Sequence, residues 1–504
     1  MKEENFISVT VNMAGFEYDI HSLVKAFYPA CDVRVTVGEE KENGSGPGLP
    51  DLNIRFEEEA VLCSLLSGGE DGTASFGGKK VEITPDMPRA EVKNRLKQLL
   101  YVSLSEHTGK QLPWGTLTGI RPTKIPMMML EEGLDDAGMM EYMKDTYLIS
   151  EEKGKLAIEI ARREKQLLET LHYENGYSLY IGIPFCPTTC LYCSFTSYPI
   201  VSWRKRVGEY LEALEKEIDF VAKTYKDKVL DTIYIGGGTP TTLEAGELAR
   251  LLNKLRDSLD LSHLKEFTVE AGRADSITAE KLKVLKEGGV TRISVNPQTM
   301  KQETLDLIGR RHTVEQVKEA FALAREAGFT NINMDLILGL PGETAEDVRN
   351  TMREVKKLKP DSLTVHSLAI KRASKLSQWI EENGITALNN TDETMQITMD
   401  GAREMGMVPY YLYRQKNMSG NFENVGYAEE GKFGIYNILI MEEKQTIVAL
   451  GAGSITKRVY PDGRIERCDN VKNVGLYIEK IDEMIERKKK LLSEPLAGSM
   501  RKLL

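Results

Sequence analysis

The sequence is poor in cysteine, in long apolar runs and in excess positive charge. Only six cysteines occur in 504 residues, and three of them fall within eight residues, which is not the pattern of a disulfide-stabilised secreted domain. Nowhere do about 18 apolar residues run together, so we expect no membrane-spanning helix. Residues 1–16 contain no apolar segment typical of a signal peptide, so we expect a cytoplasmic protein.

The charge balance limits the kinds of partner that the protein can have. The net charge is −10 at pH 7, whereas binding to nucleic acids or to acidic membranes depends on a basic surface. We therefore expect no nucleic-acid partner. The hydrophobic fraction of 41% and the charged fraction of 28% are typical of a globular protein, and the length favours more than one domain.

The first third of the chain has the pattern of an α/β domain, which we place at residues 1–170 and whose role the sequence does not reveal. Its expected strands and helices follow from period-2 and period-3.6 hydrophobic patterns. The strands are Asn5–Met13, Cys31–Val37 and Asp51–Phe56, with a hairpin of Thr73–Phe76 and Lys79–Thr84 across Gly77-Gly78, and the helices are His21–Tyr28, Arg89–His107 and Ser150–Tyr173. Trp114–Lys124 (WGTLTGIRPTK) is a turn-rich stretch without an assigned structure.

From Tyr177 onwards, short β-branched runs alternate with helical segments. The expected strands are Ser178–Pro184, Asp231–Gly236, Glu266–Ala271, Thr291–Asn296, Asn331–Leu338 and Asp361–Ala369, and the helices between them include Val207–Tyr225, Glu244–Leu255, Thr278–Glu287, Val314–Ala327 and Ala345–Leu358. Repeated βα units predict a parallel sheet, and six units are fewer than the eight of a closed barrel. The prediction is therefore an α/β fold with a partial (β/α)6 barrel at residues 171–386.

The remaining residues, 387–504, have a mixed pattern that predicts a smaller α+β extension. Its expected elements are a helix at Thr391–Met405, strands at Val408–Tyr413, Phe433–Ile440 and Gln445–Leu450, a turn at Pro461–Gly463 and a helix at Val474–Leu491.

The most specific chemical signal is the spacing of Cys186, Cys190 and Cys193, directly after the first strand of the βα repeat. Thiolates at these positions on a loop can hold a four-iron, four-sulfur (4Fe–4S) cluster and leave one iron without a protein ligand. S-adenosylmethionine (SAM) can chelate that iron through its amino and carboxylate groups. The alternatives are a structural zinc site, which requires a fourth ligand, and buried thiols without a function.

Other polar or glycine-rich positions fall at the ends of the expected strands, where ligands bind in βα folds. Gly236–Pro240 allows close approach of backbone to a ligand, although a tight turn would explain the glycines equally well. Glu270, Gln298 and Asp335 also lie at or near strand ends. Each could instead be a structural partner of a neighbouring strand.

Several segments together resemble the oxygen-independent coproporphyrinogen III oxidase family of radical SAM enzymes. The matching segments are Tyr180–Phe195, Gly236–Pro240, Glu270, Arg292–Gln298, Ile308–Thr313, Asp335–Glu343 and Ala449–Ile455. The N-terminal region with WGTLTGIRPTK resembles the branch called coproporphyrinogen dehydrogenase. The resemblance implies a 4Fe–4S cluster on Cys186, Cys190 and Cys193, and SAM contacts at Tyr180, Tyr192, Gly237, Gly238, Thr239, Glu270, Gln298, Arg310 and Asp335. Ala369 and Ile455 match further contact positions for a second SAM.

The resemblance also implies a reaction and its partners. It is the oxidative decarboxylation of two propionate groups of coproporphyrinogen III to the vinyl groups of protoporphyrinogen IX, with flavodoxin or ferredoxin as electron donor. Lys371, Arg372 and Arg414 are candidates for binding the substrate's carboxylates. The family's usual histidine is replaced by Gly182, and its His-Asn-x-x-Tyr-Trp stretch is absent from Gln415–Tyr427.

Two alternatives therefore stay open. One is a heme-binding chaperone of the same superfamily, for which His312 and His366 are candidate ligands. The other is a radical SAM enzyme with a different substrate, because fold and cofactor do not determine the substrate.

Overall fold

The computed structural model describes residues 5–38, 45–46, 48–67, 74–119, 121–173, 175–371, 374–384, 388–414 and 422–493. The chain forms two compact units, Met1–Arg162 with Leu412–Glu423, and Arg163–Tyr411 with Asn424–Leu504. Within the described ranges, no helix has both the length and the apolar character needed to cross a membrane. The division into three domains at residues 170 and 386 stays a prediction.

The first unit is built on a five-stranded sheet in the order β2-β1-β3-β4-β5. Its strands are β1 (Phe6–Val11), β2 (Asp32–Val37), β3 (Pro50–Phe56), β4 (Ala60–Ser67) and β5 (Ala74–Glu82). Helices α1 (Glu17–Phe27) and α2 (Arg89–Thr108) share one hydrophobic core with the strands. The predicted turn at Gly77-Gly78 is wrong, because β5 continues through these glycines and pairs with β4. Strand β4 itself was not predicted from the sequence.

The stretch Trp114–Lys124 stabilises the first unit from inside. The Trp114 side chain is fully buried, and its Nε1 donates a hydrogen bond to Glu423 Oε2 at 2.7 Å. Lys153, in helix α5 (Glu151–Leu168), donates to the other oxygen of Glu423 at 2.8 Å. Arg414 donates to the carbonyl oxygen of Leu117 at 2.6 Å. These contacts explain why a late segment of the chain belongs to the N-terminal unit.

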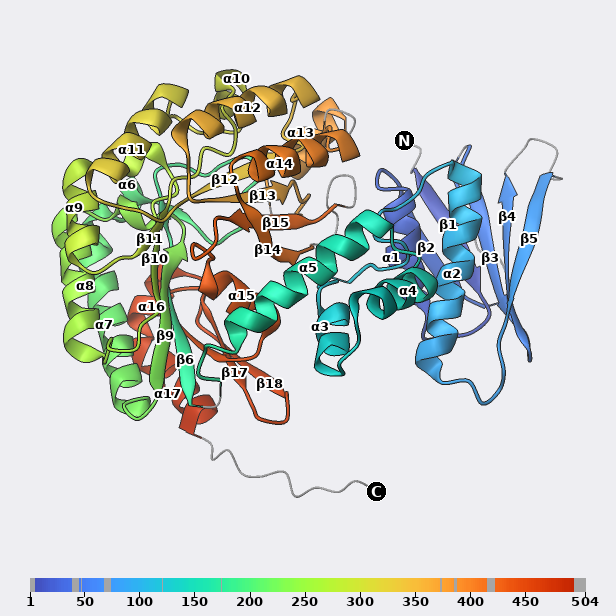
Figure 1. Cartoon of the computed structure of the whole chain (residues 1–504), viewed down its shortest axis with the longest axis horizontal. Coiled ribbons are helices and arrows are strands. Elements are labelled where there is room, and N and C mark those ends of the chain that lie inside the picture. The colour runs from blue at the N-terminus through green and yellow to red at the C-terminus, as the bar shows by residue number, and fades with distance from the viewer. Residues whose placement is uncertain are drawn as a thin grey trace. The chain divides into compact units, whose positions relative to one another are not determined.

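The second unit confirms the alternation of strands and helices. The strands are β6 (Gly176–Ile183), β9 (Val229–Gly237), β10 (Glu266–Glu270), β11 (Arg292–Ser294), β12 (Ile332–Leu338) and β13 (Ser362–Ser367), which lie parallel in the order β6-β9-β10-β11-β12-β13. Helices α7 (Val207–Thr224), α8 (Ala245–Ser258), α9 (Ala279–Glu287), α11 (Val314–Glu326) and α12 (Ala345–Leu358) lie along the outside of these strands (Figure 1). The unit is an α/β protein with a large, mostly parallel sheet.

Local chemistry explains where these helices begin. The hydroxyls of Thr278, Thr313 and Thr344 each accept a hydrogen bond from the backbone N–H three residues later, which satisfies a free donor of the first helical turn. In α12, Val348, Met352 and Val355 are buried and lie on one face. The apolar stripe therefore faces the sheet, and the charged residues face solvent.

The C-terminal strands join the same large sheet at both of its ends. They are β14 (Val408–Tyr413), β15 (Asn424–Ala428), β16 (Thr446–Leu450), β17 (Ile455–Val459) and β18 (Ile465–Asp469). β15 pairs antiparallel with β13, and β16 pairs parallel with β6. The expected turn at Pro461–Gly463 joins β17 to β18, and the Gly463 N–H donates to the Tyr460 carbonyl at 2.9 Å. The helix at Thr391–Met405 is α14 (Asp392–Glu404), whereas the last predicted helix is split at Lys480 into α16 (Val474–Glu479) and α17 (Ile481–Ser493).

The strand predicted at Phe433–Ile440 is wrong. This segment forms helix α15 (Ile435–Glu442) instead. The backbone N–H groups of Ile435 and Tyr436 donate to the carboxylate of Glu266 at 2.6 and 3.3 Å, so a residue far away in sequence caps the helix. A continuous apolar run without polar alternation fits a buried strand or a buried helix equally well. Here the carboxylate of Glu266 favours the helix, because it accepts hydrogen bonds from the first N–H groups of α15.

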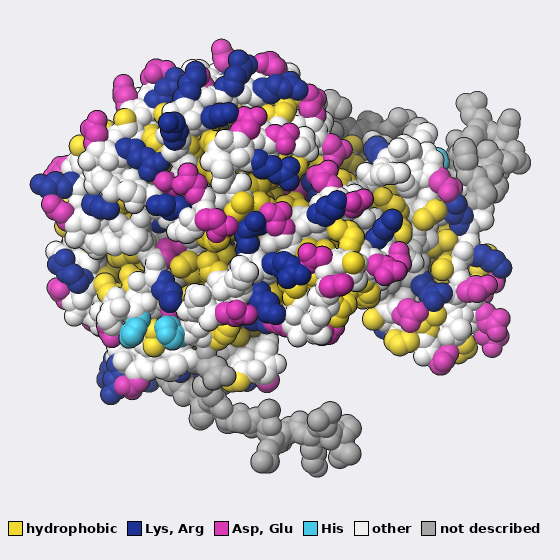
Figure 2. Space-filling view, in the orientation of Figure 1, with side chains coloured by type: hydrophobic (Ala, Val, Ile, Leu, Met, Phe, Trp, Pro, Cys, Tyr) yellow, Lys and Arg dark blue, Asp and Glu magenta, His cyan; other side chains and the backbone are white. Residues whose placement is uncertain are grey.

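The surface charges are mixed. Figure 2 shows lysines and arginines interspersed with aspartates and glutamates over the visible face of the second unit.

Candidate functional site

The three clustered cysteines lie on a loop that follows the first strand of the parallel sheet. After β6, the short strand β7 (Phe185–Cys186) leads into this loop, which also carries Cys190 and Cys193. All three are free thiols, of which Cys190 is buried and the other two are partly exposed. Each of the three thiols interacts electrostatically with the other two, so they occupy one neighbourhood.

Later segments of the chain hold this cysteine loop in place. The Leu191 N–H donates to the Ile308 carbonyl at 3.0 Å, and the Leu376 N–H donates to the Leu191 carbonyl at 3.0 Å. The Thr188 hydroxyl donates to the Gly309 carbonyl at 2.9 Å. Leu191 also packs against an apolar cluster that includes Ile308 and Leu376. The loop therefore has a defined shape although it lacks regular secondary structure.

The glycines of Gly236–Pro240 allow the backbone to pass directly beside the start of the cysteine loop. The Gly238 N–H donates to Ile183 O at 2.8 Å, and the Thr239 N–H donates to Phe185 O at 2.7 Å. A Cβ atom on Gly238 would lie 2.5 Å from Phe185 O, so no other residue fits there. The Thr239 hydroxyl lies 3.5 Å from Cys186 Sγ as a hydrogen-bond donor. The glycines are explained by this close approach, which a turn alone would not require.

One face of the parallel sheet collects the polar residues expected at strand ends. Strand register pairs Tyr180 with Tyr234 and Glu270 with Ser294, and continues through β12, which carries Asp335. Because paired residues on neighbouring strands share a face, these side chains line one surface. Three tyrosine rings stack on it: Tyr234 lies 4.5 Å from Tyr436 and 6.2 Å from Tyr180, centroid to centroid.

Glu270 is the most perturbed acid of this face. The Tyr234 hydroxyl donates to Glu270 Oε1 at 2.5 Å. Burial raises the pKa of Glu270 to about 7, although the hydrogen bond from Tyr234 opposes this rise. The neighbouring charge of Asp335 raises the pKa further. The carboxyl group can therefore change its protonation state near neutral pH, which is common at functional sites.

Asp335 lies in a different environment from Glu270. His366 Nε2 lies 3.8 Å from Asp335 Oδ2, and the Asn333 amide donates to Asp335 Oδ1 at 2.6 Å. Burial would raise the pKa of Asp335, but the His366 and Asn333 side chains outweigh it and lower the pKa. Asp335 is thus ionised at neutral pH and can accept hydrogen bonds from a ligand.

Gln298 is held in an unusual backbone conformation. Its φ angle is +69°, in the left-handed region that non-glycine residues rarely adopt. The Gln298 N–H donates to Asp335 O at 2.9 Å, and the Ile337 N–H donates to Gln298 O at 2.9 Å, so β12 enforces the conformation. Backbone strain that the surrounding structure maintains is typical of ligand-binding positions.

Arg310 is buried beside the cysteine loop. Its Nη1 donates to the carbonyls of Asn296 at 2.5 Å and Gly272 at 3.3 Å, and its Nη2 donates to the Tyr192 hydroxyl at 3.3 Å. Arg310 also interacts with the Cys190 thiol. The structure thus brings the sequence-predicted residues Arg310 and Tyr192 together with the cysteines.

The donor set fits the two groups that the sequence predicts. Among the described residues, no group of three or more His, Cys, Asp or Glu side chains surrounds a point as the ligands of a single metal ion do. A 4Fe–4S cube is wider than one ion, and three thiolates on one loop match three of its irons. Three buried atoms near the strand ends, Ser294 Oγ, Asn296 Oδ1 and Arg310 Nε, have no hydrogen-bond partner within the described part of the chain. Because unpaired buried polar atoms cost about 1–3 kcal/mol each, these positions fit a ligand rich in polar groups, as SAM is.

Two of the predicted positions lie beside strands that are not neighbours in the sheet order. Ala369 follows β13 and is partly exposed, whereas Ile455 begins β17 and is 46% exposed. Six strands lie between β13 and β17 in the sheet order. A second SAM at these residues stays a prediction.

The glycine at position 182 is not required by packing. At Gly182, an added Cβ would meet Leu450 O at 3.4 Å and Tyr180 Cε1 at 3.5 Å, which are tolerable contacts.

The candidates for binding carboxylates or heme differ in their surroundings. Lys371 is partly exposed, and burial lowers its pKa. Arg372 lies outside the described residues, as does most of the segment that replaces the family's His-Asn-x-x-Tyr-Trp stretch. Arg414 is 4% exposed and belongs to the first unit, where its guanidinium lies 5.8 Å from the centre of the Trp114 ring. His312 is fully buried, whereas the His366 side chain is 26% exposed.

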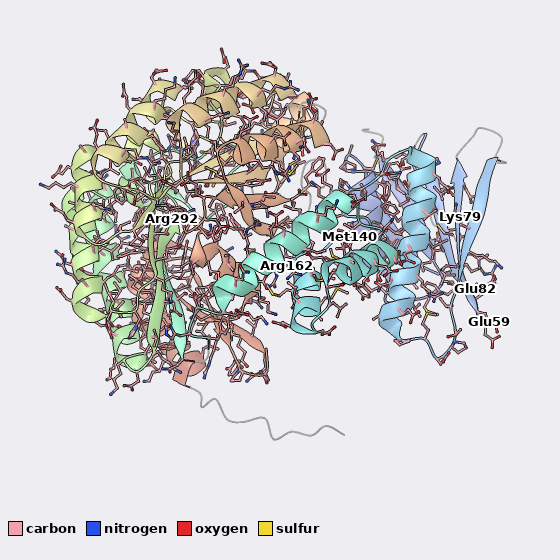
Figure 3. All side chains as sticks on the ribbon, viewed as in Figure 1. Glu59, Lys79, Glu82, Met140, Arg162 and Arg292 are labelled. Carbon is pink, nitrogen blue, oxygen red and sulfur yellow. The ribbon has the colours of Figure 1, made fainter. Side chains whose placement is uncertain are left out.

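Sequence reasoning missed several residues of this site. Arg273 and Asp275 form a bidentate pair beside the cysteine loop, and Tyr436 completes the tyrosine stack from a helix predicted as a strand. Arg292 lies among the strands of the large sheet (Figure 3) and donates to the Ser362 hydroxyl at 2.8 Å. The sequence signal that could have identified Arg273 and Asp275 is their Arg-x-Asp spacing shortly after the strand-end Glu270.

The three isolated cysteines lie outside the site. Cys31 and Cys63 are buried core thiols as expected, and Cys468 is partly exposed.

This chain is similar to known proteins of the radical SAM superfamily. The family model described as "Radical SAM superfamily" matches residues 180–355. The oxygen-independent coproporphyrinogen-III oxidase-like protein HemZ of Bacillus subtilis (strain 168) is 42% identical over 484 residues, which cover 94% of this chain and 95% of that protein. The heme chaperone HemW of the same organism is 45% identical over 195 residues, 38% of this chain and 50% of that protein. Among solved structures, coproporphyrinogen III oxidase (HemN) from Escherichia coli, a radical SAM enzyme, has a similar fold, with a TM-score of 0.50 and 23% identity over 64% of this chain and 72% of that one.

Proposed function

This chain belongs to the radical SAM superfamily, among the oxygen-independent coproporphyrinogen III oxidase-like proteins, and from this premise we propose that it oxidatively decarboxylates coproporphyrinogen III. The observation that carries the proposal is the position of Cys186, Cys190 and Cys193 on one anchored loop, next to the glycine-lined end of β9. The family implies a 4Fe–4S cluster and SAM, and the three cysteines fit its spacing.

The proposed roles of the residues follow from their chemistry. The three thiolates would bind three irons and leave the fourth for SAM. The backbone groups of Gly237 and Gly238 would contact SAM, and Glu270 and Asp335 would accept hydrogen bonds from its hydroxyl and amino groups. Tyr180, Tyr192, Thr239, Gln298 and Arg310 would complete the SAM site. When bound, the cluster and SAM supply a 5′-deoxyadenosyl radical.

The proposed substrate chemistry balances for each of the two propionates separately, with 5′-deoxyadenosine carrying away the hydrogen atom. Each of two propionates gives up one hydrogen atom from the carbon next to the ring, one CO2 and one electron, and becomes a vinyl group. The electron requires an external acceptor, and reduction of the cluster requires a donor such as flavodoxin or ferredoxin. Lys371 is the described basic residue that we propose for the substrate's carboxylates.

The protein's own residues would protect this chemistry from water and side reactions. The stacked Tyr180, Tyr234 and Tyr436 rings would cover part of the sheet face next to Glu270. The hydrogen bond from Tyr234 holds Glu270 in one orientation. We propose further that the six βα units form the partial barrel of radical SAM enzymes and that the protein acts in the cytoplasm.

An anaerobic assay tests the proposal directly. The reconstituted protein is incubated with SAM, a reductant and coproporphyrinogen III, and 5′-deoxyadenosine, CO2 and protoporphyrinogen IX are measured together. All three products are expected. SAM cleavage without CO2 would mean a radical SAM enzyme with another substrate. Stoichiometric heme binding without SAM cleavage would instead favour a chaperone like HemW, whose candidate ligand here is the partly exposed His366.

SAM affinity is expected to rise with pH through neutrality because of Glu270. The raised pKa of about 7 means that the carboxyl is protonated below this pH and ionised above it. An ionised carboxylate accepts stronger hydrogen bonds, so the dissociation constant of SAM should fall about tenfold between pH 6 and pH 8. Equilibrium binding to the cluster-loaded protein measures this change. Glu270→Gln should bind SAM weakly and without this pH dependence, and an unchanged profile in that variant would exclude Glu270 as the titrating group.

A further inference from the structure

Arg273 lies in contact with the cysteine loop but is not one of the expected cofactor residues. Its side chain is 3% exposed. Nη1 donates to Thr188 Oγ1 at 2.7 Å and to Thr188 O at 3.2 Å, and lies 4.0 Å from Cys190 Sγ. Thr188 stands between Cys186 and Cys190. One guanidinium therefore contacts both the backbone that separates two cysteines and the sulfur of one of them.

The orientation of Arg273 is set by a carboxylate on the same turn. Arg273 Nε donates to Asp275 Oδ1 at 3.0 Å, and Nη2 donates to Asp275 Oδ2 at 2.6 Å. This bidentate pair uses the guanidinium edge formed by Nε and Nη2, and it leaves Nη1 directed at the cysteine loop. His312 Nδ1 lies 3.8 Å from Asp275 Oδ1. Burial opposes ionisation of Asp275, but His312 and Arg273 outweigh it and hold the pKa of Asp275 below its ordinary range.

A buried cation at this position has an electrostatic consequence for a cluster held by these cysteines. Adding an electron makes a thiolate-bound cluster more negative, so a fixed positive charge near a ligand sulfur stabilises the reduced form more than the oxidised form. Asp275 offsets part of this effect because its negative charge pairs with the Nε and Nη2 atoms, whereas Nη1 is the atom within 4.0 Å of the sulfur. Reduction potentials of such clusters respond to hydrogen bonds and charges around the sulfurs.

We propose that Arg273, oriented by Asp275, is a positioning residue of the cysteine loop that raises the reduction potential of the cluster. This inference rests on the proposed cluster at Cys186, Cys190 and Cys193. Arg273 and Asp275 would control how readily the cluster accepts an electron, whereas the three cysteines would bind it. Thr188 connects Arg273 to the anchoring of the cysteine loop, because its hydroxyl accepts a hydrogen bond from Arg273 and donates one to the Gly309 carbonyl.

The test is a redox titration of the reconstituted protein, in which the reduced cluster is quantified by electron paramagnetic resonance. In Arg273→Gln, the ratio of reduced to oxidised cluster at a fixed ambient potential should fall about tenfold, the size expected for a buried charge partly offset by its partner. In Asp275→Asn, the ratio should rise, because the offsetting charge is lost while Arg273 remains. Opposite signs at neighbouring residues are not expected from a general loosening of the fold.

Arg250→Gln is the matched control. Arg250 forms the same bidentate pair with Glu215, at 2.6 and 2.8 Å, but on the exposed surface of α8. The reduction potential of the cluster in Arg250→Gln should equal that in the unmodified protein. If Arg273→Gln and Asp275→Asn also show the unmodified potential with a full complement of iron, the inference is wrong. Should Arg273→Gln lose its iron, Asp275→Asn decides alone. A failure of the unmodified protein to bind iron would contradict the proposed function instead.

Discussion

Cys186→Ser is expected to abolish iron–sulfur cluster formation and SAM cleavage while the protein stays folded. Serine replaces the sulfur with a poor iron ligand, and the two thiolates that remain cannot hold a cube that needs three. The fold should survive because the Cys186 side chain has one weak hydrogen-bond contact, from Thr239 at 3.5 Å. Iron content, visible absorption and 5′-deoxyadenosine production after anaerobic reconstitution measure the effect. SAM cleavage should fall to the level found without protein.

Cys468→Ser provides the matched control for this result. Cys468 is a partly exposed free thiol on β18, outside the cysteine loop. Its replacement should leave iron content and SAM cleavage unchanged. Equal iron content in Cys186→Ser and the unmodified protein would falsify the assignment of the cluster to this loop.

Lys488→Met is expected to destabilise the second unit by about 3–5 kcal/mol, as removal of one partner from a buried ion pair usually does. Lys488 and Glu217 form an ion pair, and both side chains are 0% exposed. Glu217 also accepts from the Tyr477 hydroxyl at 2.6 Å and from the Gly451 N–H at 2.8 Å. Without Lys488, the Glu217 carboxylate would be buried with no cation. The free energy of unfolding in urea, followed by circular dichroism, measures the loss.

A neighbouring residue of the same helix serves as the control for burial. Lys489 pairs with Glu486 at 3.2 Å, but these side chains are 57% and 61% exposed. Lys489→Met should therefore cost less than about 1 kcal/mol. The double variant Lys488→Met with Glu217→Gln should be less destabilised than Lys488→Met alone, because it leaves no unpaired buried charge. Equal losses for Lys488→Met and Lys489→Met would contradict a buried pair.

The βα repeat was predictable because its information is local. Each strand is a short β-branched run, and each helix has an apolar stripe such as Val348, Met352 and Val355, often preceded by a threonine cap. The position of Cys186 directly after the first strand of this repeat could be read in the same way. Strand pairing then follows from the short connections between consecutive elements.

The errors occur where distant residues decide the local structure. The run Phe433–Ile440 becomes helix α15 because Glu266 caps it. No hairpin forms across Gly77-Gly78, because β5 continues through both glycines and pairs with β4. Trp114–Lys124 has no recognisable periodicity, and its role follows from the hydrogen bond that Trp114 donates to Glu423. Neither hydrophobic periodicity nor turn chemistry contains these contacts.

The sequence by itself determined the spacing of the three cysteines, the alternation of strands and helices and the family resemblance, because each depends on residue order alone. Only the tertiary structure decided which side chains surround the cysteine loop. Arg273, Asp275 and Arg310 meet there because parallel strands β10 and β11 end at the same edge of the sheet. The pKa of Glu270 likewise depends on its surroundings: burial and Asp335 raise it, and the hydrogen bond from Tyr234 opposes the rise. Electrostatic environment is a property of spatial neighbours, and the chain order does not reveal them.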